Sequence, residues 1–88
     1  MRFAEIDRRF AQIHKYIENK QTGTASAFAK KLKIGKSTLY RYLKIIEQDY
    51  FIRVSYDEYF DSFIYPEDII VTYGGTFRFQ KKDSDKDN

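Results

Sequence analysis

The sequence contains no cysteine, no tryptophan, one histidine and one proline among its 88 residues. Without cysteine the chain can form no disulfide, iron–sulfur cluster, thiolate zinc site or thiol nucleophile. The one histidine, His14, has no second histidine or cysteine with which to share a transition metal, so we expect it on the surface or at the edge of the core. We therefore expect no metal and no cofactor, and the lack of cysteine fits a reducing compartment.

Long apolar runs are missing as well. No stretch approaches the roughly 20 residues that a helix needs to cross a bilayer, and residues 1–5 lack the apolar stretch of a secretion signal. These absences predict a soluble, cytoplasmic protein.

The length suits one small domain, whose core must be filled largely by aromatic side chains, 8 Phe and 8 Tyr. Residues 80–88 include no apolar side chain. We therefore expect one domain over residues 1–79, followed by a polar, disordered tail over residues 80–88.

Charge is distributed unevenly along the chain. Residues 19–44 carry no Asp or Glu and seven basic side chains, namely Lys20, Lys30, Lys31, Lys33, Lys36, Arg41 and Lys44. Residues 45–88 carry five basic and ten acidic residues. A basic centre followed by an acidic half favours a polyanionic partner, although a solvated lysine-rich face is the plain alternative.

Apolar spacing predicts three helices. The stripe Phe3, Ile6, Phe10, Ile13 and Ile17 steps by three and four residues, which indicates an amphipathic helix over residues 2–20. A second helix is expected over residues 25–32, capped by Thr24, and a third over residues 36–48, with Gly35 at its cap. On a helical wheel of the third helix, the buried face carries Leu39, Leu43 and Ile46, and the face directly opposite carries Ser37, Arg41 and Lys44. Thr38 and Tyr40 flank that outward face.

The period changes to two after Tyr50. Residues 52–56 and 63–65 read as the strands of a β-hairpin, whose loop contains Asp57, Glu58 and Asp61. Pro66 ends this hairpin. A further apolar stretch, residues 69–71, leads to a two-residue Gly74-Gly75 turn that could fold back onto Phe77 and Phe79.

The order of three helices and a hairpin, together with residues 24–43, TASAFAKKLKIGKSTLYRYL, resembles a winged helix-turn-helix domain of the biotin-repressor-like class of small bacterial transcriptional regulators. The resemblance implies an α+β, mainly α fold that binds double-stranded DNA with its third helix in the major groove. It places Lys36, Ser37, Tyr40, Arg41 and Lys44 toward the bases, assisted by Thr38, and Lys30, Lys31 and Lys33 beside phosphates. Lys36 and Lys44 could also hold phosphates.

Three positions depart from this pattern. Lys33 occupies the turn position where such motifs usually have glycine, and Gly35 replaces the usual Ser or Thr cap. The hairpin carries Asp57, Glu58 and Asp61 where a wing normally offers basic residues, so we expect it to stand off the duplex or to bind another partner.

Other functions find less support. Ser37 has no base to activate it, so we expect no enzyme activity. The three hairpin acids do not have the spacing of a calcium loop, and Gly74-Gly75 lacks the lysine and the setting of a phosphate loop. Two partner interactions stay open. A homodimer could use the stripe of the first helix or the strand after Pro66, and a protein-binding adaptor could use the acidic hairpin with its aromatic residues Tyr59 and Phe60.

Overall fold

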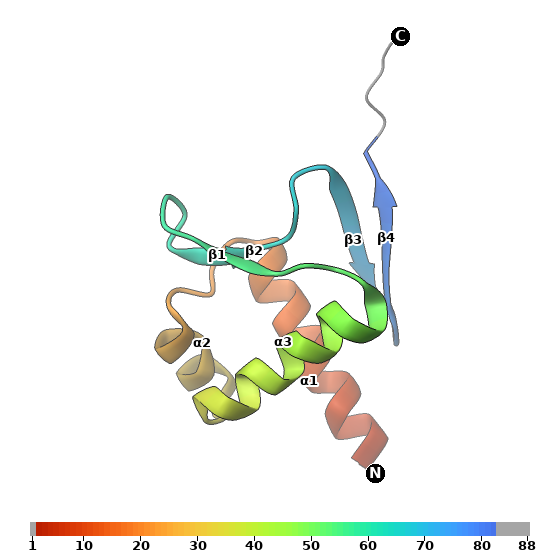
Figure 1. Ribbon diagram of the computed structural model, residues 1–88. Coiled ribbons are helices and arrows are strands. Elements are labelled where there is room, and N and C mark those ends of the chain that lie inside the picture. Colours follow the sequence, from red (N-terminus) through yellow and green to blue (C-terminus); the bar gives the residue numbers. More distant parts are fainter. Residues whose placement is uncertain (1, 83–88) are drawn as a thin grey trace, which may run out of the picture.

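The computed structural model describes residues 2–82, with side chains from residue 4 onward. Three helices are followed by two antiparallel strand pairs (Figure 1), and the elements are α1 (Arg2–Glu18), α2 (Ala25–Leu32), α3 (Lys36–Tyr50), β1 (Ser55–Asp57), β2 (Ser62–Ile64), β3 (Ile69–Tyr73) and β4 (Phe77–Lys81). The expected α+β, mainly helical class, with helices first and a hairpin after them, is confirmed. None of the described helices is long and apolar enough to cross a membrane.

Helix α1 buries most of the apolar stripe that the sequence predicts for it. Phe10, Ile13 and Ile17 of α1 are buried, whereas Ile6 of the same stripe is 44% exposed. The side chain of Phe3 lies outside the described residues. The α2 helix begins at Thr24, whose hydroxyl accepts a hydrogen bond from the backbone N–H of Ala27 at 3.3 Å, as expected for an N-cap.

The α3 helix runs two residues further than predicted, to Tyr50. Its buried residues are Leu39, Leu43 and Ile46, as the helical wheel indicates. Gly35 is the N-cap residue and offers no side-chain hydrogen bond, so the first amides of α3 are not capped by this residue's side chain.

The first strand pair is shorter than predicted. Residues 52–54 form no ladder, and β1 pairs with β2 only from Ser55 opposite Ile64 to Asp57 opposite Ser62. Ile52 is nevertheless fully buried, because it packs into the core beside the end of α3. Residues 52–54 therefore alternate between more buried and more exposed side chains without pairing with another strand.

The second strand pair is longer than predicted, and its turn differs. Tyr73 pairs with Phe77, so three residues, Gly74, Gly75 and Thr76, separate the strands instead of two. The positive φ of Gly75, 84°, is one that glycine adopts without strain. Strand β4 continues to Lys81, opposite Ile69, which shows that the tail predicted from residue 80 begins too early. Residues 83–88 of that tail lie outside the described residues.

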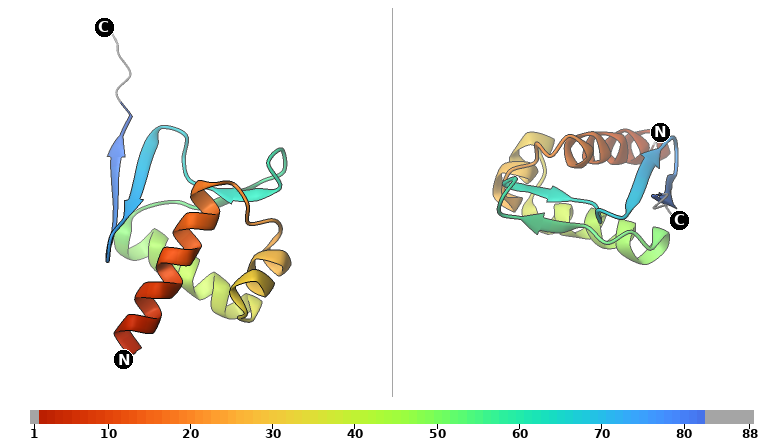
Figure 2. Two further views of the ribbon diagram at one scale, coloured as in Figure 1. Left: turned by 180° about the vertical axis from the view of Figure 1, so that it is seen from behind. Right: turned by 90° about the horizontal axis from the view of Figure 1, so that it is seen from above.

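The core lies where the helices meet the two strand pairs. Seen from above, the β1–β2 hairpin runs over the region between α1 and α3, with α2 at one end of the molecule and the β3–β4 pair at the other (Figure 2). Every helix and both strand pairs contribute buried side chains, including Phe10, Ile13, Phe28, Leu39, Ile46, Phe63, Val71 and Phe77. Aromatic rings fill much of this volume, with Phe10 meeting the rings of Tyr42 and Phe77 edge to face.

Candidate nucleic-acid interface

The outward face of α3 is exposed along its length. Lys36, Ser37, Arg41 and Lys44 are all exposed, and Tyr40 keeps 52% of its surface accessible. Thr38 is half-buried at one flank. Within residues 4–82, neither Arg41 nor Lys44 makes an ion pair or a side-chain hydrogen bond. These cationic groups are therefore free to bind an external partner.

Arg41 also borders a mostly apolar hollow of about 220 Å³ between α1 and α3, which Ile6, Phe10, Tyr42 and Ile45 line as well. The long aliphatic part of an arginine commonly covers such a surface while its guanidinium stays in water. Arg41 thus lies toward the α1 side of the exposed face, and Tyr40 and Lys44 lie further from α1.

The turn between α2 and α3 uses a left-handed residue. Lys33 has φ 60° and ψ 44°, its N–H bonds to the carbonyl of Lys30, and the N–H of Ile34 bonds to the carbonyl of Ala29. This pair of bonds is a Schellman motif, which normally places glycine at the left-handed position. Lys33 therefore occupies the left-handed position where glycine is usual, and the turn keeps its ordinary geometry at the cost of strain in the Lys33 backbone.

Helices α2 and α3 pack against each other in the core. Ala29 is 97% buried on α2, in the cluster that also contains Phe28, Leu32 and Leu39. A larger side chain at this buried position would have to displace its neighbours.

The three lysines assigned to phosphates differ in their surroundings. Lys30 and Lys33 are exposed and have no side-chain partner within the described part of the chain. Lys31 instead donates to the carbonyls of Gln21 at 2.7 Å and Thr22 at 3.3 Å. These bonds tie Lys31 to the loop before α2, so it supports that loop and is a poorer candidate for a phosphate.

The tip of the β1–β2 hairpin lies at the α2 end of the molecule (Figure 1). Tyr59 is 88% exposed there, and its ring meets that of Phe60 edge to face. The ammonium of Lys20, in the turn after α1, lies 5.1 Å from the centre of the Phe60 ring. The hairpin tip is therefore anchored to the loop between α1 and α2.

The hairpin acids are partly satisfied within the hairpin. A carboxylate oxygen of Asp57 accepts from the N–H of Phe60, and the Tyr56 hydroxyl donates to Asp61. The hydrogen bond to Asp61 raises the pKa of Tyr56 to about 12. Tyr56 is 39% exposed, and its ring meets the buried ring of Phe63 edge to face.

Two buried hydroxyls, which the sequence analysis did not single out, fix the hairpin to the helices. Thr22 and Ser62 are fully buried, with their side-chain oxygens 3.1 Å apart. The N–H of Phe63 donates to the Thr22 hydroxyl at 2.7 Å, and the N–H of Thr22 donates to the Ser62 hydroxyl at 3.2 Å. These bonds join the loop before α2 to the first two residues of β2. Thr and Ser are too common in loops for the sequence to reveal this pair.

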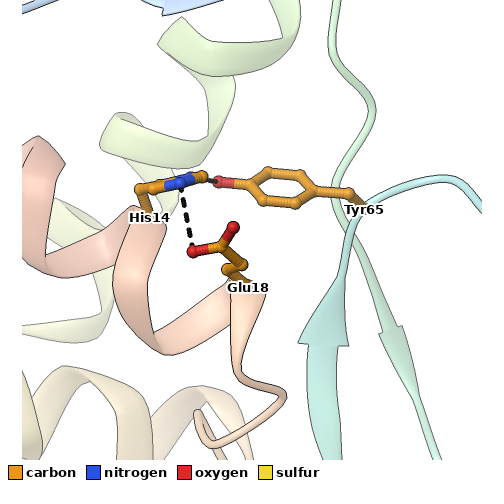
Figure 3. A network of polar contacts seen from close by, with 3 residues as sticks. All are labelled: His14, Glu18 and Tyr65. Atoms are coloured by element: carbon orange, nitrogen blue, oxygen red, sulfur yellow. Dashed lines mark hydrogen bonds and ion pairs between the residues drawn. The ribbon is translucent and has the colours of Figure 1, made fainter. Parts of the chain in front are cut away.

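His14 lies at the edge of the core, as predicted, in a polar network with Glu18 and Tyr65 (Figure 3). Its Nδ1 is 2.8 Å from the Tyr65 hydroxyl, and its Nε2 is 3.5 Å from a Glu18 carboxylate oxygen. A neutral ring with its proton on Nε2 satisfies both neighbours, since the tyrosine then donates to Nδ1. Burial lowers the pKa of His14, and Glu18 partly offsets this effect.

No group of three His, Asp or Glu side chains among the described residues could hold a metal ion. Comparison with known proteins adds nothing to this geometry, because no family model, curated protein or solved structure matches the chain. The exposed face of α3 and its surroundings are therefore the features that bear on function.

Proposed function

We propose that this protein is a winged helix-turn-helix DNA-binding protein, a small cytoplasmic transcriptional regulator that inserts α3 into the major groove of double-stranded DNA. One observation carries the proposal: an exposed face with Ser37, Tyr40, Arg41 and Lys44 lies opposite the buried face of the same helix, and no described carboxylate pairs with its cations. A major groove about 12 Å wide accepts one α-helix, and its walls are lined with phosphates.

The side chains on this face suit distinct tasks. The planar guanidinium of Arg41 can donate two hydrogen bonds to O6 and N7 of a guanine, which makes it the strongest candidate for reading a base. Ser37, Thr38 and Tyr40 can add contacts to neighbouring bases or phosphates. Lys36 stands at the N-terminus of α3, where the free amides and the absence of an acid in the first turn also favour a phosphate. This mode of binding requires neither catalysis nor a cofactor.

One copy of α3 can read only a few base pairs, so selective binding calls for two copies on two half-sites. We therefore propose a homodimer on DNA. Ile70 on β3, which is 49% exposed, is an apolar side chain that could contribute to such an interface.

Arg41→Ala tests the assignment. After selection of bound oligonucleotides from a random pool, we expect Arg41→Ala to lose about 1–3 kcal/mol of binding free energy at the selected site and to relax preference at one base pair. Arg78→Ala is the matched control, because Arg78 is an exposed arginine on β4, at the end of the molecule opposite α2. Fluorescence anisotropy titrations measure both. Equal affinity and preference for Arg41→Ala and the wild type would remove Arg41 from the base-reading role.

A second function has specific support. The exposed aromatic ring of Tyr59 projects from a hairpin tip that carries Asp57, Glu58 and Asp61, which suits contact with a basic protein surface. In this alternative the protein is an adaptor that binds a protein partner. Titration of random duplex DNA at two salt concentrations separates the functions, since DNA binding weakens steeply with salt. Negligible binding at low salt would favour the adaptor.

A further inference from the structure

A groove of about 430 Å³ lies between α1 and the turn that joins α2 to α3. Its lining includes one acid, Glu5, and four basic residues, which are Arg8, Arg9, Lys31 and Lys33. The local balance of +3 equals the formal net charge of the entire chain, although only nine residues line the groove. Positive charge is therefore concentrated here, and a cationic concavity of this kind attracts an anion.

The four cations are not equivalent. The guanidinium of Arg9 donates to the carbonyl of Leu32, the last residue of α2, and thereby joins α1 to the end of that helix. Lys31 is bound to the loop before α2. Arg8 and Lys33 are exposed and have no ion pair or side-chain hydrogen bond within the described residues. The two free donors are therefore Arg8 and Lys33, one on each side of the groove.

The groove is continuous with the exposed face of α3. Ile6 and Tyr42 line both this groove and the hollow that Arg41 borders. Lys33 also precedes the first residue of α3 by only three positions. Arg8 and Lys33 consequently lie on a surface that continues into the one bordered by Arg41.

We infer that Arg8 and Lys33 together bind one phosphate of the DNA backbone, beside the major groove that α3 enters. This inference rests on the proposed function. Arginine can engage two oxygens of one phosphate, and lysine supplies a compact second charge. Because phosphate contacts carry no base information, this site sets the affinity and the register of the protein on the duplex, and Arg41 sets the sequence preference.

The first test compares two double variants that each remove two positive charges. Arg8→Ala/Lys33→Ala empties the groove of its free donors, and Arg78→Ala/Lys81→Ala removes the same charges from β4. For one lost phosphate contact, the slope of log Kd against log salt should fall by about 0.9, and affinity at 0.1 M salt should fall about eightfold. The rank order of bound sequences should stay unchanged. The β4 variant should bind like the wild type, and circular dichroism should show both variants folded.

The second test removes the charge from the DNA. A neutral methylphosphonate is placed in turn at each phosphate flanking the selected site. At one position it should weaken the wild type about eightfold and leave Arg8→Ala/Lys33→Ala no weaker than on unmodified DNA, because that contact is already lost. If the wild type binds DNA but the groove variant behaves like the β4 variant, the phosphate site is refuted and the proposed function stands. If the wild type binds no DNA at low salt, the proposed function itself fails.

Discussion

Lys33 combines a strained backbone with a charge on the proposed DNA surface, so two substitutions at this position, Lys33→Gly and Lys33→Ala, can test the strain and the charge separately. At φ 60° and ψ 44° a β-carbon costs about 1–2 kcal/mol relative to glycine. Glycine in turn loses about 0.5–1 kcal/mol through the greater entropy of the unfolded chain. The exposed side chain adds no packing term. The backbone terms by themselves therefore favour glycine over a residue with a β-carbon by about 0.5–1 kcal/mol.

Lys33→Ala is the control that separates backbone strain from charge. Both substitutions remove an ammonium near the C-terminal end of α2, where a positive charge contributes about 0.3–1 kcal/mol. Only glycine also removes the β-carbon. The difference between the two variants should therefore favour glycine by about 0.5–1 kcal/mol, which corresponds to about 2–8 °C in Tm for a domain of this size.

Urea denaturation and thermal melting followed by circular dichroism measure this difference, and anisotropy titration with duplex DNA measures binding. Both variants should bind DNA more weakly than the wild type, by similar factors, since both lose the same charge. A glycine variant no more stable than the alanine variant would refute the left-handed strain at this turn. DNA binding equal to that of the wild type in both variants would refute the proposed contact of Lys33 with DNA.

Two further perturbations test the structure around the hairpin and α1. Thr22→Val keeps the side-chain shape but leaves the buried N–H of Phe63 without its acceptor. We therefore expect the free energy of unfolding, measured by urea denaturation, to fall by about 1–3 kcal/mol. A fall below about 0.5 kcal/mol would mean that the hydroxyl pair does not fix the hairpin. Because burial lowers the pKa of His14 below its ordinary 6.5, the unfolded chain binds more protons below about pH 6.5, and stability should fall as the pH drops from there toward the folded-state pKa. In His14→Gln this part of the pH profile should be flatter, and an unchanged profile would contradict the assignment.

Much of the helical part of the fold is predictable because it depends on local periodicity. The spacing of Phe10, Ile13 and Ile17, and the caps at Thr24 and Gly35, place the helices to within two residues. The strands are less predictable, because pairing depends on a partner segment. Residues 52–54 alternate like a strand yet pair with nothing, and Gln80 and Lys81 are polar yet extend β4.

The residues of the candidate site likewise include some whose position is predictable from the sequence and some whose position is not. The exposure of Ser37, Arg41 and Lys44 follows from the angle between successive residues on one helix, and a wheel gives it directly. Lys31 instead donates hydrogen bonds to the carbonyls of Gln21 and Thr22. These contacts depend on how the loop before α2 folds, so the sequence does not predict them.

The amino-acid sequence by itself determined the three helices, the main buried faces of α1 and α3 and the outward cations of α3, because helical periodicity acts over a few neighbouring residues. The tertiary structure alone decided that Arg8 of α1 stands across a groove from Lys33, and that Thr22 holds β2 through Ser62. These pairs are separated by 25 and 40 positions, and only the crossing of α1 with the end of α2 and the docking of the hairpin bring them together. Local rules cannot supply such contacts, since they arise from the packing of the whole core.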